Sequence, residues 1–381
     1  MRCPGGHWAF VPNPLPPPIT WEPALVAALS AADRAIGRRA GEGRRLPNPH
    51  LLIRPFVRRE AVLSSRIEGT QATLGELLAA EAGAAVERSP DDLREVGNYV
   101  VALEYGVERL STLPLSLRLI RELHERLMRG VRGDVATPGA FRRSQTWIGP
   151  PGSTLANATF VPPPPDRVME CLGPWETFLR DDTVPPLVNA ALAHSQFEAI
   201  HPFLDGNGRV GRLVITLSLV DRDVLPSPLL YLSAFFEATR AEYYARLLGV
   251  TERGEWEAWL TYFLTGVAAQ ADDALDRIQR IDGLLARWRR RLASATSRLP
   301  ERALDLFAQN PFWTVNKTAA TLEVAFTSAQ RAIDRLESAG IITQTDSARR
   351  NRIYCARDLL EILEEPPKLG TNRKPRRSPR R

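Results

Sequence analysis

Residues 193–212 read AHSQFEAIHPFLDGNGRVGR. The first part is typical of a helix, and Pro202 disfavours helical backbone at His201, so we expect the helix to end there. Residues 205–208, Asp-Gly-Asn-Gly, predict a tight turn because Gly and Asn tolerate positive φ. A second amphipathic helix is expected from Arg209 onward. The stretch therefore predicts two helices joined by a short glycine-rich loop.

The same loop combines the groups that phosphate chemistry requires. A glycine-rich turn that enters a helix N-terminus binds anions through converging N–H groups and the helix dipole. Arg209 and Arg212 add two guanidiniums, which match phosphate oxygens bidentately. Asp205 offers a hard oxygen ligand for Mg²⁺, and His201 is a base that titrates near neutral pH. Together these groups predict phosphate-ester chemistry on a nucleotide.

The remainder of the chain predicts a mainly α protein. Helical spacing of apolar residues recurs through an N-terminal region, residues 1–92, and a core, residues 93–293. The pattern is interrupted at residues 130–165, which are rich in Gly and Pro, and a long loop between helices is often functional. Residues 159–161 inside this loop predict a short strand, which would form a β-hairpin flap.

Residues 297–365 predict a separate module with the pattern of a winged helix. Three short helices are expected, followed by alternating segments at residues 341–343 and 352–354 that predict a hairpin. A helix–turn–helix followed by a two-stranded wing is typical of nucleic-acid-binding modules. Residues 366–381 follow as a Pro- and Arg-rich tail, which we expect to be disordered.

The distribution of charged residues and the cysteine content indicate further properties of the protein. Seven basic residues stand against one acid in residues 365–381, a net +6 that equals the net charge of the whole chain. The basicity therefore belongs to the tail. The three cysteines, Cys3, Cys171 and Cys355, are far apart, which indicates a reducing cytoplasm rather than a disulfide framework. Neither a signal peptide nor a membrane span is expected.

The segment HPFLDGNGRVGR resembles the signature of the Fic family (filamentation induced by cyclic AMP), H-P-F-x-D-G-N-G-R-x-x-R, and matches it at every fixed position. Further similar segments are EVGNY at 95–99, IRELH at 120–124, PGAFR at 138–142 and SQTWIG at 144–149. The resemblance runs from about residue 10 to residue 293 and implies a Fic-type helical bundle that carries a flap.

The resemblance implies a protein adenylyltransferase that moves AMP from Mg-ATP to a Ser, Thr or Tyr hydroxyl of a protein, including itself. Mn²⁺ stays open as a substitute for Mg²⁺. The implied residue roles are His201 as base, Asp205 as metal ligand, Gly206, Asn207 and Gly208 with Arg209 at the α- and β-phosphates, and Arg212 at the γ-phosphate. The implied flap residues, which dock the target segment as an added strand, are Thr159, Phe160 and Val161. Thr251 stands where relatives often carry Asn near the adenine.

Residues 64–69, Ser-Ser-Arg-Ile-Glu-Gly, resemble the inhibitory motif of the same family, [S/T]-x-x-x-E-[G/N]. The resemblance implies that Ser64 and Glu68 lie on an N-terminal helix and that Glu68 pairs with Arg212. Arg212 could then not hold the γ-phosphate. In some relatives this glutamate is thought to assist removal of AMP, so the reverse reaction stays open.

Other functions compete with this interpretation. His194, Glu198 and His201 recur at i, i+4 and i+7 before Asp205, a spacing that also fits a metal-dependent phosphohydrolase with His124 as a further ligand. A DNA-binding regulator with a Fic core is another alternative, through the winged helix or the basic tail. The predicted third helix of the module is nearly neutral, which argues against strong DNA binding. Transfer of another group and a homodimer also stay open.

Overall fold

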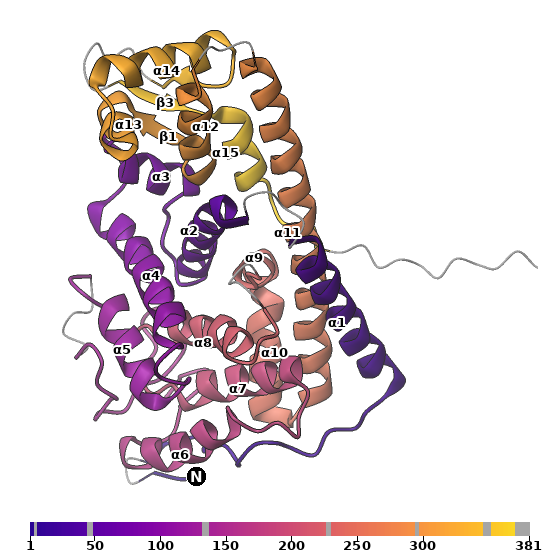
Figure 1. Ribbon diagram of the computed structural model, residues 1–381. Coiled ribbons are helices and arrows are strands. Elements are labelled where there is room, and N and C mark those ends of the chain that lie inside the picture. The colour runs from indigo at the N-terminus through magenta and orange to yellow at the C-terminus, as the bar shows by residue number, and fades with distance from the viewer. Residues whose placement is uncertain are drawn as a thin grey trace, which may run out of the picture.

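The computed structural model describes residues 1–3, 6–43, 49–131, 137–225, 230–293, 297–345 and 352–369. These residues form a mainly helical protein, as the sequence predicts (Figure 1). No helix among them is both long and apolar enough to pass through a bilayer. The larger body contains the helices α1 (Pro23–Gly43), α2 (Pro49–Ile67), α3 (Leu74–Ala82), α4 (Pro90–Arg109), α5 (Leu117–Leu127), α6 (Val168–Phe178), α7 (Pro186–Ile200), α8 (Asn207–Asp221), α9 (Ser233–Ala238), α10 (Arg240–Arg253) and α11 (Trp256–Leu292), and the 3₁₀ turn η2 (Pro165–Arg167).

Helices α7 and α8 lie at the centre of the larger body (Figure 1). Nearly every residue of both helices is buried, so neither shows the one-sided polar face of a surface helix. Helix α4 packs against α5 and α8, where a Cβ at Gly106 would lie 2.8 Å from the Leu217 side chain. A glycine is therefore needed at this crossing. The long helix α11 borders the bundle, with α1 beside it.

Helix α2 is joined to α4 and α9 by a buried carboxylate, that of Glu60. Glu60 Oε1 accepts hydrogen bonds from the Tyr99 hydroxyl on α4 at 3.2 Å and the Ser233 hydroxyl on α9 at 2.5 Å. Burial raises the pKa of Glu60, although these two hydroxyl donors oppose the shift. The next turns of the same helix lead to Ser64 and to Glu68. The two hydrogen bonds to Glu60 therefore help to fix the orientation of the C-terminal end of α2.

The smaller, C-terminal part combines helices with a three-stranded antiparallel sheet. Its elements are α12 (Leu299–Gln309), β1 (Phe312–Thr314), α13 (Val315–Leu322), α14 (Phe326–Ser338), β2 (Thr343–Gln344), β3 (Ile353–Cys355) and α15 (Arg357–Glu364). The strand order is β1-β3-β2, and Trp313 lies opposite Tyr354. The winged-helix assignment stays a prediction. Strand β1 and helices α9 and α15 were not predicted, because three to eight residues give too little periodicity.

The C-terminal end of the described chain is held against α11. Arg277 pairs with Asp273 at 2.7 Å in the interior and donates to the carbonyl oxygens of Ile362, Glu365 and Pro366. Lys368 pairs with Asp276 at 2.7 Å. The tail boundary expected at residue 366 therefore falls inside a segment that these contacts hold in place. Residues 370–381 of the predicted tail lie outside the described residues.

Candidate active site

His201 ends α7 in a left-handed conformation, with φ 50° and ψ 60°. Pro202 follows it, and the buried Arg142 side chain donates to the His201 carbonyl oxygen at 2.8 Å. Burial, together with the nearby Arg142 charge, lowers the pKa of His201 to about 4. The imidazole is therefore neutral at pH 7, and its Nδ1 has no hydrogen-bond partner among the described residues.

The loop between α7 and α8 is held by the side chain of Asn207. The N–H of Phe203 donates to Asn207 Oδ1 at 2.8 Å, and Asn207 Nδ2 donates to the Phe203 carbonyl oxygen at 2.9 Å. His124 stacks on the Phe203 ring, with ring centroids 3.8 Å apart, and its Nε2 lies 3.1 Å from the Asp205 carbonyl oxygen. Two side chains thus fix the loop, and its shape is set before any ligand arrives.

The N-terminus of α8 opens toward this loop. Gly206 is the N-cap, with φ 76°, and the first intrahelical bond runs from the Val210 N–H to the Gly206 carbonyl oxygen. The N–H groups of residues 207–209 therefore precede the hydrogen-bond ladder of the helix. Asp205 is 51% exposed beside them, and its Oδ1 lies 3.6 Å from Arg209 Nη2. The structure thus places the predicted anion site next to the predicted metal ligand.

Glu68 lies against Arg212, as the inhibitory motif implies. The distance from Glu68 Oε1 to Arg212 Nη2 is 2.6 Å, and Arg212 Nε donates to the Ser64 hydroxyl at 2.8 Å. Burial alone would raise the pKa of Glu68, but the charge of Arg212, its hydrogen bond to Glu68 and the nearby Arg209 and His201 together lower the pKa. Both partners are therefore charged, and Arg212 is bonded through Nε and Nη2 to Ser64 on α2 and to Glu68 in the turn after it.

The same carboxylate also lies over the N-terminus of α8. A side chain at Gly208 would collide with Glu68 Oε1, so the carboxylate sits against the Gly208 backbone. A helix N-terminus attracts negative charge through its free N–H groups and its dipole. Glu68 thus places its negative charge between Arg212 and the N-terminus of α8.

The predicted flap is reduced to a single antiparallel bridge. The N–H groups of Ile148 and Phe160 donate to each other's carbonyl oxygens at 2.8 and 3.0 Å, and no strand is formed at these described residues. Val161 faces the opposite edge, where its carbonyl oxygen accepts the N–H of Phe10 at 2.9 Å. The hairpin expected at residues 159–161 is therefore wrong in extent. One carbonyl of the edge expected to receive a target segment is already bonded to the N-terminal arm.

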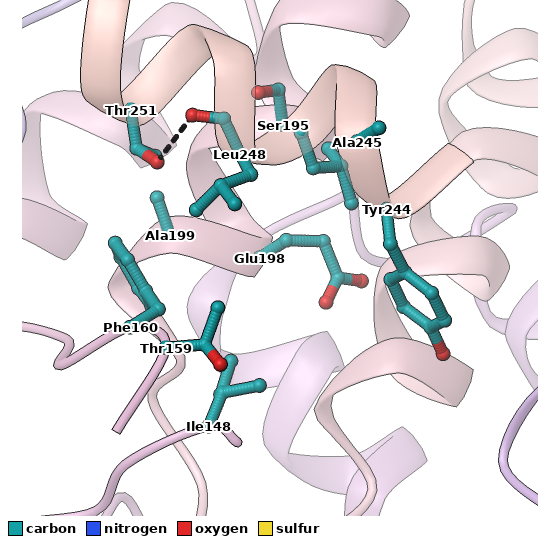
Figure 2. A pocket seen from close by; sticks show the side chains of 11 residues that line it. Ile148, Thr159, Phe160, Ser195, Glu198, Ala199, Tyr244, Ala245, Leu248 and Thr251 are labelled. Atoms are coloured by element: carbon teal, nitrogen blue, oxygen red, sulfur yellow. Dashed lines mark hydrogen bonds between the residues drawn. The ribbon is translucent and has the colours of Figure 1, made fainter. Parts of the chain in front are cut away.

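A cavity of about 220 Å³ lies between the flap, α7 and α10 (Figure 2). Thr251 lines it, as expected for the adenine site, but its hydroxyl donates to the Leu248 carbonyl oxygen at 3.0 Å within α10. The walls are mainly apolar, and the residues that line the cavity are Ile148, Thr159, Phe160, Ser195, Glu198, Ala199, Tyr244, Ala245, Leu247, Leu248 and Thr251.

Two polar residues of this cavity were not predicted as nucleotide-binding groups. Glu198 Oε1 and the Ser195 hydroxyl are buried and have no hydrogen-bond partner among the described residues. Burial raises the pKa of Glu198 to about 8, against the attraction of Arg212. One signal was present in the sequence: Ser195 and Glu198 are spaced i, i+3 before His201 and so share a helix face with it.

The metal-dependent phosphohydrolase gains no support from the geometry. The residues that the structure describes include no group of three His, Cys, Asp or Glu side chains that could hold a metal ion. His194 Nε2 lies 2.8 Å from the Tyr243 hydroxyl, and His124 accepts the Gly139 N–H. Burial lowers the pKa of His194 to about 3 and that of His124 to about 4. Both side chains are neutral parts of the packing.

Comparisons with known proteins agree with the signature. Residues 26–108 match the family "Fic/DOC family N-terminal", and residues 114–219 match "Fic/DOC family". "Protein adenylyltransferase fic-1" of Caenorhabditis elegans is 30% identical over 222 residues, which covers 55% of this chain and 39% of the relative. "Protein adenylyltransferase Fic" of Drosophila erecta is 32% identical over 160 residues, which covers 40% of this chain and 30% of the relative.

Solved structures show the same fold. A Fic family protein from Desulfovibrio desulfuricans G20 superposes with a TM-score of 0.60 at 23% identity, over 90% of this chain and 98% of that one. A Fic domain-containing signaling protein from Bacteroides thetaiotaomicron superposes with a TM-score of 0.51 at 18% identity, over 64% of this chain and 96% of that one.

The helical fold and the 201–212 loop define a Fic-domain protein. The chain is a Fic/DOC family protein, distantly related to protein adenylyltransferases. It spans about two fifths or less of the length of the two curated relatives described above.

Proposed function

We propose that this protein transfers AMP from Mg-ATP to a hydroxyl group of a protein, and that Glu68 holds it in an inhibited state. The observation that carries the proposal is the position of the Glu68 carboxylate, 2.6 Å from Arg212 and against the Gly208 backbone. An anion thus already fills the place where the phosphate end of a nucleotide would be bound by a helix N-terminus and a guanidinium.

Different residues of the loop have different roles in the catalytic step. The target hydroxyl attacks the α-phosphorus, a new O–P bond forms, the bond to the β-phosphate oxygen breaks, and pyrophosphate leaves. His201 is neutral at pH 7 and accepts the hydroxyl proton. The N–H groups of residues 207–209 stabilise negative charge that develops on the phosphate oxygens. Asn207 keeps these donors in position through its two bonds to Phe203.

Asp205 fits a magnesium ion that arrives with the nucleotide. Its side chain is 51% exposed at the mouth of the loop, and among the described residues it belongs to no group of three His, Cys, Asp or Glu side chains that could hold a metal ion. Mg²⁺ often takes only one or two protein carboxylates and completes its shell with phosphate oxygens and water. When bound, the ion would neutralise phosphate charge, and Mn²⁺ would fit the same oxygen ligands.

Inhibition follows from competition for Arg212. While Glu68 and Ser64 occupy the guanidinium, the γ-phosphate has no positive partner there and meets the Glu68 charge instead. ATP would then bind with its phosphates displaced from in-line geometry. The reverse reaction, removal of AMP, uses the same site and remains a second activity to measure.

The flap would dock the target segment, with Thr159, Phe160 and Val161 as its edge. The exposed edge beside the cavity supports this role, because β-addition needs free backbone groups. Since Phe10 already bonds to Val161, we expect the target to displace the N-terminal arm or to pair on one side of it only.

The test is transfer from ATP labelled at the α-phosphate, compared with ATP labelled at the γ-phosphate. The Glu68→Gly variant, with itself and a cell lysate as acceptors, should incorporate only the α-label. His201→Ala in the same background is the control and should incorporate neither. Incorporation of the γ-label would instead assign phosphate transfer and would contradict the proposal.

A further inference from the structure

Glu198 is a buried carboxyl that no described residue satisfies. Its Oε1 has no hydrogen-bond partner, and the nearest basic atom of His194, Nδ1, is 4.0 Å away. Arg212 also faces it, but the guanidinium is bonded to Glu68 and Ser64. Buried polar groups nearly always have a hydrogen-bond partner. A buried polar group without one destabilises the fold unless a ligand or a water molecule bonds to it.

The surroundings indicate what kind of ligand completes it. The cavity beside Glu198 is walled mainly by apolar side chains, including Phe160, Leu248 and Tyr244. Figure 2 shows the Glu198 carboxyl directed into the middle of this cavity, between Thr159 and Tyr244. An apolar slot with a few convergent polar groups is typical of a site for a flat, mostly apolar ring such as a nucleobase.

Two other hydroxyl groups that line the cavity, those of Thr251 and Tyr244, already have hydrogen-bond partners in the protein. The Thr251 hydroxyl is used within its own helix, and the Tyr244 hydroxyl lies 3.4 Å from the Ile67 carbonyl oxygen. Ser195, one turn before Glu198, is likewise without a partner among the described residues. Among the described residues that line the cavity, the buried hydrogen-bonding atoms without a partner therefore belong to α7, whereas the Thr159 side chain on the flap is exposed.

We propose that Glu198 is a specificity-determining residue that recognises the base of the bound nucleotide, by pairing its carboxyl with the 6-amino group and the adjacent ring nitrogen of adenine. This inference rests on the proposed function and goes beyond it by naming the residue that reads the base. A carboxyl that keeps its proton offers one donor and one acceptor side by side, and adenine offers the reverse pair. The pKa of about 8 supports this protonated form at neutral pH.

The groups that face Glu198 favour the same state. On α8, Arg212 attracts a charged carboxylate, but its own charge is balanced by Glu68, which repels that carboxylate. His194 on α7 is neutral at pH 7, and the hydroxyls of Tyr243 and Tyr244 on α10 have raised pKa values. On α8, a side chain at Gly211 would collide with Glu198, so a glycine gives the carboxyl its room.

The experiment is a cycle between the protein side chain and the base, in full-length protein that keeps Glu68, because Glu68 balances the charge of Arg212 beside Glu198. Binding of ATP and of purine riboside triphosphate, which lacks the 6-amino group, is measured by calorimetry at pH 7 with and without Glu198→Leu. We expect the unmodified residue to prefer ATP by roughly tenfold and Glu198→Leu to lose that preference. Glu198→Gln, which keeps one donor and one acceptor, should retain most of it.

Other outcomes are decisive as well. An equal preference for ATP with and without the Glu198→Leu substitution would overturn base recognition by this carboxyl while leaving AMP transfer intact. If the substitution instead abolished discrimination between ATP and 2′-deoxy-ATP, Glu198 would be assigned to the ribose, which would also overturn it. If neither triphosphate binds to the folded parent protein or to folded Glu68→Gly protein, the proposed function fails first, and the inference fails with it.

Discussion

The two ends of the nucleotide cleft differ in how their polar groups are satisfied. At the phosphate end, Arg212 is bonded to Ser64 and Glu68, and the same carboxylate covers the N-terminus of α8. At the nucleoside end, Glu198 and Ser195 face a cavity of about 220 Å³ with no partner among the described residues. At the phosphate end, the Glu68 carboxylate thus occupies the place of an anionic ligand. At the nucleoside end, no described side chain occupies the place of a base.

This difference suggests how the inhibited protein meets ATP. A nucleoside can enter its pocket without displacing a protein group, whereas the terminal phosphate must compete with an ion pair whose Glu68 pKa is lowered. Glu68 would therefore disturb the alignment of the ATP phosphates more than it lowers the fraction of protein that has ATP bound. Substitutions at one end of the cleft, with the other end unchanged as a control, can separate an effect on phosphate alignment from an effect on ATP binding.

The largest effect is expected from His201→Ala. General-base catalysis contributes about 10²- to 10⁴-fold, so transfer by the Glu68→Gly protein should fall by that factor. ATP binding should change little, because the imidazole contacts neither the cavity nor Arg212 in the interactions described above. Steady-state transfer and calorimetric binding, measured together, check both halves of this prediction.

Glu68→Gly should raise transfer by about 10- to 100-fold, because freeing a charge-assisted partner of the γ-phosphate is worth roughly 1.5–3 kcal/mol. Glu87→Gly, at an exposed glutamate, is the matched control and should leave transfer unchanged. A folded Glu68→Gly protein that labels no faster than the parent would remove the inhibitory role from this residue.

Glu198→Gln should change the pH dependence of stability. The folded pKa of Glu198, about 8, lies above its ordinary value, so its contribution to stability is complete at low pH and is lost as pH rises toward 8. The amide does not titrate. The difference in unfolding free energy, Gln variant minus parent, should therefore grow between pH 5 and pH 8 by on the order of a few kcal/mol. Chemical denaturation at several pH values measures it, and a constant difference would show that this carboxyl is not protonated in the fold.

Gly208→Ala should have different effects in two backgrounds. In the parent protein the new methyl group would meet the Glu68 carboxylate and destabilise the fold by about 1–3 kcal/mol. With Glu68→Gly the nearest obstacle is gone and Arg212 Nη1, 3.0 Å from the new Cβ, is the closest remaining atom, so replacing the helical glycine should cost less or be neutral. Unfolding free energies of the four proteins decide this, and equal effects in both backgrounds would place Glu68 away from Gly208 in solution.

The smallest effect is expected from Phe10→Ala. The ring lies 5.7 Å from that of Phe160, and the Phe10 N–H bonds to Val161. Loss of the ring contact, worth about 0.5–1.5 kcal/mol, should loosen the arm and raise transfer to another protein by a few-fold in the Glu68→Gly background. Trp21→Ala, at an exposed aromatic residue farther along the chain, serves as the control. No change would mean that the arm does not compete with the target.

The features that the sequence predicted well are local ones. Residues 201–212 carry the turn, the helix start and the charged groups within one short segment, so their types and spacing already indicate an anion site. Helix α7 ends at Ile200, next to the end predicted at His201, and α8 begins at Asn207, two residues before the start predicted at Arg209. The contact between Glu68 and Arg212 was expected only because the short motif at residues 64–69 resembles a known one.

The remaining features depend on contacts between distant parts of the chain. His124 stacks on Phe203, and Phe10 reaches Val161, yet neither pair has any periodic relation in the sequence. Glu198 was weighed as a metal ligand because its spacing to His194 fits one, whereas burial beside an apolar cavity gives it a different environment. Burial and orphaned hydrogen-bonding atoms are tertiary properties, and no local pattern reports them.

The most direct test is a single time course of α-labelled ATP transfer with Mg²⁺, run side by side for the parent protein, Glu68→Gly, Glu68→Gln and the Glu68→Gly, His201→Ala double variant. We expect weak labelling of the parent, faster labelling with both Glu68 substitutions because each removes the negative charge at Arg212, and no labelling of the double variant. Equal labelling of parent and Glu68 variants, or labelling that survives loss of His201, would contradict this expectation.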